Sequence, residues 1–243
     1  MALATARAVP FRFTVPRRES IVVLILLWRR LRADARAKLG LGTVIVLVLL
    51  AVLAPVVARY DPTTIDLAGQ LQHPSLAHWM GTDYQGRDVW ARIVYGARIS
   101  LSVGVVSQTI ALALGVTLGL VSGFYGRWID ESIMRLADIT LAFPTLLLLI
   151  ALAAALQPSL STVFLTIGVV GWAGMARIVR GQVLVTRQLE FVQAARALGA
   201  TDRRIIVQHL LPNVVAPVII AATLGVAGAI MAEAALSFLG LGV

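Results

Sequence analysis

Residues 190–212 form the stretch whose residue types and spacing are best suited to contact with another molecule. Helix-forming residues fill its first part, and we expect Gly199 to end that helix, because glycine adopts the left-handed C′ conformation without a Cβ penalty. One face of the helix gathers residues at spacings of three, four and seven: Phe191, Ala194, Ala195 and Leu198. The spacing therefore predicts a short amphipathic helix.

The second part of the same stretch predicts another short helix. Thr201 or Asp202 can accept a backbone N–H as its N-cap, and we expect Pro212 to interrupt it. The resulting helix-turn-helix hairpin is basic and lies between two strongly apolar segments. Two interpretations fit such a hairpin: a surface that rests on lipid headgroups, or a surface presented to a protein partner.

The particular string favours a protein partner, because it resembles the signature loop of the membrane subunits of ABC importers. The residues that carry the resemblance are Glu190, Ala194, Ala195, Gly199, Leu211 and Pro212. In that family the loop is the coupling helix, which docks into a groove on a cytoplasmic ATPase. The resemblance implies that Glu190 anchors the hairpin through a charged contact and that Gly199 allows its turn. The paired alanines would permit close approach.

Composition places the chain in a membrane. Of its 243 residues 59% are hydrophobic and 14% are charged, and the mean hydropathy is +0.88, whereas soluble domains are about 45–50% apolar and about 25% charged. The net charge of +9 follows membrane topology rather than nucleic-acid binding, because the arginines gather in segments expected inside the cell. The lack of cysteine excludes disulfides and thiol catalysis.

The N-terminal segment, residues 1–38, is strongly basic and is expected to stay in the cytoplasm. Its apolar run at residues 21–28 is far shorter than the roughly 20 residues of a spanning helix, so we expect an interfacial elbow helix there. A signal peptide is the alternative, but no small-residue cleavage site follows. The first span is expected at residues 39–58, and an outer segment with balanced charges at residues 59–98.

The outer segment holds a second motif, formed by Gly81, Asp83, Gly86, Arg87 and Asp88. It resembles the Gly-Thr-Asp-x-x-Gly-Arg-Asp segment of the dipeptide, oligopeptide and nickel branch of these permeases. The same residues predict a turn with positive φ at Gly86 and a helix that Asp88 caps. His73 and His78 lie nearby, but no third ligand stands at metal spacing beside them, so no metal site is predicted.

Four further spans are expected at residues 99–125, 133–156, 160–178 and 213–236. They predict an all-α membrane bundle, and the resemblance implies one of the type I ABC-importer permease kind. Close helix contacts are predicted by glycines that recur in the second and fourth spans: Gly115, Gly119, Gly123, Gly168, Gly171 and Gly174. We expect five spans where the family normally has six, so the chain is either truncated or lacks the last span. The expected domains are residues 1–38, 39–98 and 99–243, and the last contains the coupling loop at 181–212.

A few polar residues within the spans are candidates for the pathway or its gating. Asp138 is either a polar element at the cytoplasmic mouth of a channel or the partner of Arg135 in an ion pair. Pro144 is expected to break or kink the third span. Glu233 lies near the outer boundary, either beside the substrate portal or paired with a local arginine. The polar side chains of the second span, Ser107 and Gln108 among them, suit helix contacts or a wet pathway.

The resemblance implies a multi-pass permease subunit of a binding-protein-dependent importer in the bacterial plasma (inner) membrane, in contact with its lipids. Its implied partners are a homologous second permease, two ABC ATPases and an extracytoplasmic substrate-binding protein. The sequence has no Gly-x-x-x-x-Gly-Lys-Ser/Thr loop, so we expect ATP and Mg to be used by the ATPases, with no catalytic residue and no cofactor on this chain.

Several alternatives remain for the function. Peptides are favoured over nickel or another small solute, because the spans hold few histidine, methionine or cysteine ligands. A secondary transporter would need ionisable groups in mid-span. A membrane-embedded hydrolase would need a nucleophile with its base, or a metal cluster, within the spans.

Overall fold

The computed structural model describes residues 34–157 and 159–242, so the expected elbow helix at residues 21–28 lies outside the described residues. The chain divides into two units, residues 1–49 and 50–243, which we describe separately. The division expected from the sequence, at residues 38 and 98, stays a prediction.

The expected first span is a helix that begins earlier and ends earlier than residues 39–58. Helix α2 (Ala35–Val52) crosses the boundary between the two units, and α3 (Ala54–Val57) follows after Leu53. Pro55 lies in the first turn of α3, where its missing N–H costs no hydrogen bond, so a new helix can begin there. Most side chains of α2 are exposed, as suits a helix that lies in lipid.

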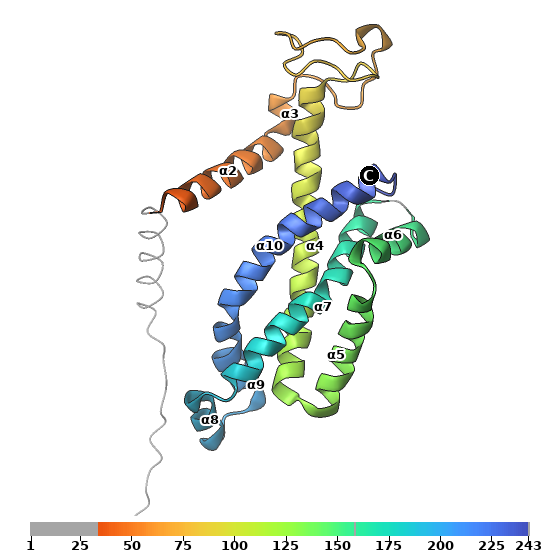
Figure 1. The fold of residues 1–243 in the computed structure, drawn as a ribbon. Coiled ribbons are helices and arrows are strands. Elements are labelled where there is room, and N and C mark those ends of the chain that lie inside the picture. The colour runs from red at the N-terminus through yellow and green to blue at the C-terminus, as the bar shows by residue number, and fades with distance from the viewer. Residues whose placement is uncertain (1–33, 158, 243) are drawn as a thin grey trace, which may run out of the picture. The chain divides into compact units, whose positions relative to one another are not determined.

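The regular elements of the second unit are helices, and among the described residues the only strand-like pairing is an isolated bridge between Thr82 and Asp88. The elements are η1 (Leu67–Gly69), α4 (Val89–Tyr125), α5 (Arg127–Ala142), α6 (Thr145–Ala155), α7 (Leu160–Thr186), α8 (Glu190–Ala197), α9 (Asp202–Arg204), the π-helix η2 (Ile205–Leu210) and α10 (Leu211–Phe238). The segment before α4 and the hairpin of α8 and α9 lie at opposite ends of α4 (Figure 1).

Four described helices are long and apolar enough to cross a membrane: Ala35–Val52, Val89–Tyr125, Leu160–Thr186 and the continuous run Asp202–Phe238. The pair formed by α5 and α6 makes a fifth span if the two halves are counted together. The expectation of an all-α bundle is therefore confirmed, and the expected five spans are reached when α5 and α6 are counted as one span. The second span extends ten residues further toward the N-terminus than expected, because α4 begins at Val89.

Helices α4 and α7 pack closely through the glycines of α4. A Cβ at Gly115 would lie 2.5 Å from the Met175 Cβ, and one at Gly123 would lie 2.7 Å from the Val183 Cβ. Real Cβ atoms essentially never lie this close to a neighbouring atom, so any residue other than glycine would force the two helices or their side chains to shift. The close contact predicted from the glycine spacing is confirmed for α4 and for Gly168 and Gly171 of α7, but not for Gly174, where a Cβ would meet nothing within 4 Å.

The third span is broken rather than kinked. Helix α5 ends at Ala142, Phe143 is extended, and α6 begins at Thr145 at an angle of 89° to α5. Pro144 stands at the break, as expected, because proline disfavours helical geometry in the residue before it.

Pro212 does not interrupt the second helix of the hairpin, contrary to expectation. It lies in the first turn of α10, and the helical run continues from Asp202 to Phe238. The preceding residues, Ile205–Leu210, form a π-helix, in which the wider i→i+5 spacing absorbs the change in hydrogen-bond register.

Candidate functional site

The hairpin turns at Gly199 with a Schellman arrangement. The Gly199 N–H donates to the Arg196 carbonyl and the Ala200 N–H donates to the Ala195 carbonyl, both at 3.0 Å. Gly199 has φ of +78°, in the left-handed region that glycine alone adopts without strain. The turn predicted from the sequence is thus confirmed. Thr201 stands at the N-cap of α9, but neither it nor Asp202 makes the expected side-chain capping bond.

The apolar face predicted for α8 points outward. Phe191 is 44% exposed and Leu198 is 88% exposed, whereas Val192 is 1% exposed. Val192 packs in a cluster with Ile205 and Leu210 of the π-helix, so it holds the hairpin to the bundle. Sequence reasoning missed this anchor, because a single valine carries no periodic signal. The outward face is free to contact another molecule.

Glu190 and the alanine pair lie on this same hairpin. Glu190 is the first residue of α8 and is exposed, and Ala194 and Ala195 occupy the middle of that helix. Leu211 and Pro212 begin α10. The structure thus brings the six residues of the proposed coupling motif into the hairpin and the helix start behind it, while their roles stay predictions.

Arginines connect the base of the hairpin to the end of α4. The Arg187 guanidinium donates to the Gly123 carbonyl at 2.8 Å, and the Arg196 guanidinium lies 5.5 Å from the centre of the Phe124 ring. Deeper in the bundle, Arg180 of α7 holds Asp130 of α5 by two hydrogen bonds of 2.5 and 2.6 Å. These contacts link α8 and the end of α7 to the end of α4, and they link α7 to α5.

Ser122 completes this cluster, since its hydroxyl donates to the Asp130 carboxylate at 2.5 Å. Side-chain exposure is 33% for Arg180 and 17% for Asp130, so the pair is partly withdrawn from water. Bidentate charge-assisted bonds of this kind are stronger than neutral ones and fix the orientation of both groups. The sequence offered no signal for this pair, because its two charged members lie fifty positions apart.

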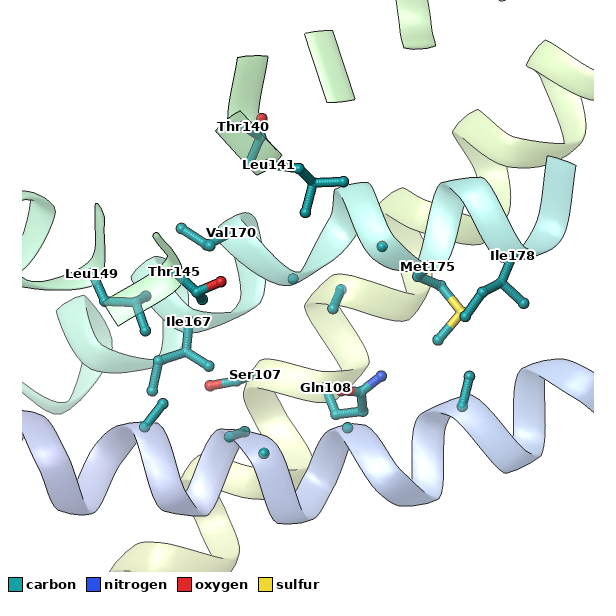
Figure 2. Close-up of a pocket in the computed structure, with 18 residues that line it drawn as sticks. Ser107, Gln108, Thr140, Leu141, Thr145, Leu149, Ile167, Val170, Met175 and Ile178 are labelled. Atoms are coloured by element: carbon teal, nitrogen blue, oxygen red, sulfur yellow. The ribbon is translucent and has the colours of Figure 1, made fainter. Parts of the chain in front are cut away.

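A cavity of about 340 Å³ lies between α4, α5, α6, α7 and α10. Its polar lining consists of Ser107, Gln108, Thr140 and Thr145, and none of the lining residues is ionisable. Ser107 and Gln108 project from α4 between α7 and α10 (Figure 2). Two of the polar residues of α4 therefore line a cavity, while the wet pathway considered for them stays a prediction.

Asp138 pairs with Arg177 of α7 and not with Arg135, so the predicted pair within the helix is wrong. Arg135 instead lies 4.0 Å from Glu131, one turn earlier in α5. The Asp138 and Arg177 side chains are about half exposed, and surface pairs of this kind contribute about 0–1 kcal/mol. Asp138 does not line the cavity. Leu141 and Thr145, which lie on either side of Pro144 in the sequence, do line it.

Glu233 is buried between α10 and α4. It is 8% exposed, and its two carboxylate oxygens accept hydrogen bonds from Ser100 at 3.1 Å and from Ser237 at 2.8 Å. No arginine of the described residues pairs with it, so the predicted arginine partner is wrong. The carboxylate instead ties two spans together near the end that carries the outer segment.

The outer motif is a tightly bonded turn around Asp83. Its carboxylate accepts the backbone N–H groups of Gln85 at 2.8 Å and Arg87 at 3.0 Å, and the guanidinium groups of Arg87 and Arg92. Burial raises the pKa of this carboxyl, but the hydrogen bonds from Gln85 and Arg87 outweigh it and lower the pKa from 3.8 to about 2.

The predicted turn glycine and cap are both confirmed. Gly86 has φ of +74°, and Asp88 caps α4 by accepting the Ala91 N–H at 2.7 Å. Gly81 also has φ of +74°, and a Cβ there would lie 2.3 Å from the Gln72 carbonyl oxygen. His78 contributes its ring nitrogen to the Asp88 carboxylate at 2.9 Å, which gives it a structural role. Among the described residues no group of three metal-ligating side chains occurs.

Comparison with known proteins agrees with this architecture. Residues 115–243 match the family described as "Binding-protein-dependent transport system inner membrane component", and residues 23–74 match the "N-terminal TM domain of oligopeptide transport permease C". The dipeptide transport system permease protein DppC of Alkalihalophilus pseudofirmus is 46% identical over 88% of this chain and 71% of its own length.

Two proteins of Bacillus subtilis are similar to nearly the same extent. The oligopeptide transport system permease protein OppC is 42% identical over 89% of this chain and 72% of its own length. The dipeptide transport system permease protein DppC is 44% identical over 89% of this chain and 68% of its own length. The chain therefore belongs to the family of inner-membrane components of binding-protein-dependent transport systems.

Proposed function

We propose that this chain is one permease subunit of an ATP-driven importer of di- or oligopeptides, forming half of the translocation pathway. The names of its relatives support a peptide substrate, since all three similar proteins are described as dipeptide or oligopeptide permeases. The uncharged cavity is compatible with that substrate class. ATP is hydrolysed by partner ATPases, and this chain binds no cofactor of its own.

The observation that carries the proposal is the outward apolar face of α8 on a fixed base. Phe191 and Leu198 are exposed, while Val192 beneath them is 1% exposed and packs on the π-helix. A docking element needs both properties, because an unsupported helix would yield when the partner moved. The occupant we propose for this face is a groove on the cytoplasmic ATPase.

We further propose that the polar cluster at the base of the hairpin transmits the motion. ATP closes the ATPase dimer, the dimer moves the hairpins of both permeases, and each hairpin moves the ends of α4, α5 and α7 through Arg187, Arg180 and Asp130. The spans then rock between inward-open and outward-open states. Glu190 anchors the hairpin, and Glu233 and Pro144 act near the pathway as gating elements.

The remaining partners follow from the family. They are a homologous second permease and an extracytoplasmic substrate-binding protein that contacts the side of residues 59–88. The N-terminus and the hairpin then lie in the cytoplasm, since basic segments stay on that side. Nickel is the alternative substrate, and the cavity speaks against it, because Met175 is the only lining residue with a soft ligand atom and no histidine lines it.

The test is coupling in the complete importer. Gly199→Val places a β-branched residue at φ of +78°, where it is strained, and should abolish the stimulation of ATPase activity by loaded binding protein. Gly96→Val is the matched control, because a Cβ at Gly96 meets nothing within 4 Å. Both variants should insert into the membrane. Stimulation that survives in Gly199→Val would refute the coupling role, and uptake of nickel without peptide uptake would refute the substrate.

A further inference from the structure

The cavity contains two polar groups with unused hydrogen-bonding capacity. The Ser107 hydroxyl is fully buried and has no hydrogen-bond partner among the described residues. Other hydroxyls of the same helix are satisfied by their own backbone: Thr109 donates to the Val105 carbonyl and Thr117 to the Ala113 carbonyl, each at 2.7 Å. Buried polar groups without partners are rare and costly, so an exception next to a cavity calls for an explanation, such as a bound water, ion or ligand.

Gln108 follows Ser107, and its carboxamide lies against Gly225 of α10. A Cβ at Gly225 would lie 2.1 Å from the Gln108 Oε1, so only glycine leaves room for the carboxamide there. Gln108 is 9% exposed and lines the same cavity as Ser107 (Figure 2). The carboxamide offers both an N–H donor and a C=O acceptor to whatever enters.

We propose that this cavity is a transit site for the amide backbone of a peptide, and that Gln108 and Ser107 bind that backbone. The inference rests on the proposed function. A carboxamide can donate to a backbone C=O and accept from a backbone N–H, and it can do so whichever way the peptide runs. The Ser107 hydroxyl supplies a further donor or acceptor beside it.

The rest of the lining explains why the backbone, and not the side chains, is recognised. The lining has no ionisable group, so it does not discriminate between charged side chains of opposite sign. The lining also includes Gly174 and Gly228, which leave free space in the cavity because a Cβ at either position would meet nothing within 4 Å. A volume of about 340 Å³ lies at the lower end of the range for small-molecule sites, which suits a short extended segment.

The experiment measures uptake of two probes by the complete importer in proteoliposomes, with binding protein at saturation. The probes are trialanine and trialanine methylated at both peptide nitrogens, which cannot donate a backbone hydrogen bond. Gln108→Leu removes the carboxamide at similar volume and should lower trialanine uptake about tenfold, the value of one hydrogen bond to a buried amide. Uptake of the methylated probe should change much less, so the ratio between the probes should shrink.

Two further variants separate binding from a structural effect. Gly225→Ala keeps Gln108 but displaces its carboxamide, and should shrink the same ratio. Thr109→Val is the matched control on α4, since its hydroxyl is already bonded to Val105 and lies outside the cavity lining, so both uptakes should match the unmodified importer. ATPase stimulation by loaded binding protein should persist in all three variants.

The outcomes are distinct. A Gln108→Leu importer with unchanged uptake and an unchanged probe ratio would overturn the transit site while leaving the proposed function intact. Equal losses for both probes would also overturn it, because a structural defect does not distinguish them. An unmodified importer that takes up neither peptide but transports another solute would overturn the proposed function and the transit site together.

Discussion

The contact between α4 and α7 makes a quantitative prediction for Gly119→Ala. A Cβ at Gly119 would lie 2.7 Å from both the Ala176 carbonyl oxygen and the Val179 Cβ. Ordinary carbon contacts lie at about 3.5–4.0 Å, so the helices must separate by about 1 Å. Overpacking of this kind costs about 1–3 kcal/mol of unfolding free energy. The alanine also gains helix propensity, about 1 kcal/mol over glycine, which has to be removed from the comparison.

Comparison with Gly96→Ala removes this gain in helix propensity, because Gly96 lies in the same helix and a Cβ there would meet nothing within 4 Å. The free-energy difference between the two variants is then the packing cost alone, about 1–3 kcal/mol, with Gly96→Ala the more stable. The assay is thermal unfolding of the detergent-solubilised proteins followed by circular dichroism, where about 2–4 °C corresponds to each kcal/mol for a chain of this size. Equal melting temperatures for the two variants would refute the close packing.

Three other predictions follow from the charged groups. Arg180→Lys should uncouple ATPase activity from uptake in the complete importer, because lysine cannot hold Asp130 by two bonds; a cost of about 1–2 kcal/mol in unfolding free energy should accompany it. The pKa of Asp83 is lowered from 3.8 to about 2 in the folded chain, so the stability that its ionised carboxylate contributes is complete above about pH 4 and is lost as the pH falls through 2. Limited proteolysis of residues 59–88 should increase over that interval, and Asp83→Asn should remove this pH dependence. Glu233→Gln keeps partners for Ser100 and Ser237 and should retain uptake, whereas Glu233→Leu should lose it; equal uptake by both would argue against the link between α4 and α10.

Features that depend on local chemistry could be predicted from the sequence. The left-handed turn at Gly199, the turn at Gly86 and the Asp88 cap each follow from the conformational preference of one residue. The helical spans follow from long uncharged runs, and the contact of α4 with α7 follows from glycines on one face. In these cases the cause lies within a few residues, so the pattern contains it.

Features that depend on which helices meet could not be predicted in this way. From the sequence, Asp138 could pair with more than one arginine, and only the packing of α5 on α7 selects Arg177 over Arg135. Local sequence rules predict that the helix ends before Pro212, whereas the π-helix at Ile205–Leu210 lets the helical run continue past this proline. The cavity is lined by five helices, so no single segment carries its signal beyond the polarity of Ser107 and Gln108.

The docking of α8 on an ATPase is the central claim, and a single introduced cysteine tests it most directly. The chain contains no cysteine, so Leu198→Cys, at a position 88% exposed, gives one attachment point for a photo-cross-linker on the outward face of the hairpin. Leu76→Cys, at a position 92% exposed in the outer segment, is the control. In membranes that contain the complete importer, the Leu198 probe should cross-link to the ATPase and the Leu76 probe should not. A Leu198 probe that reacts only with lipid would contradict the account.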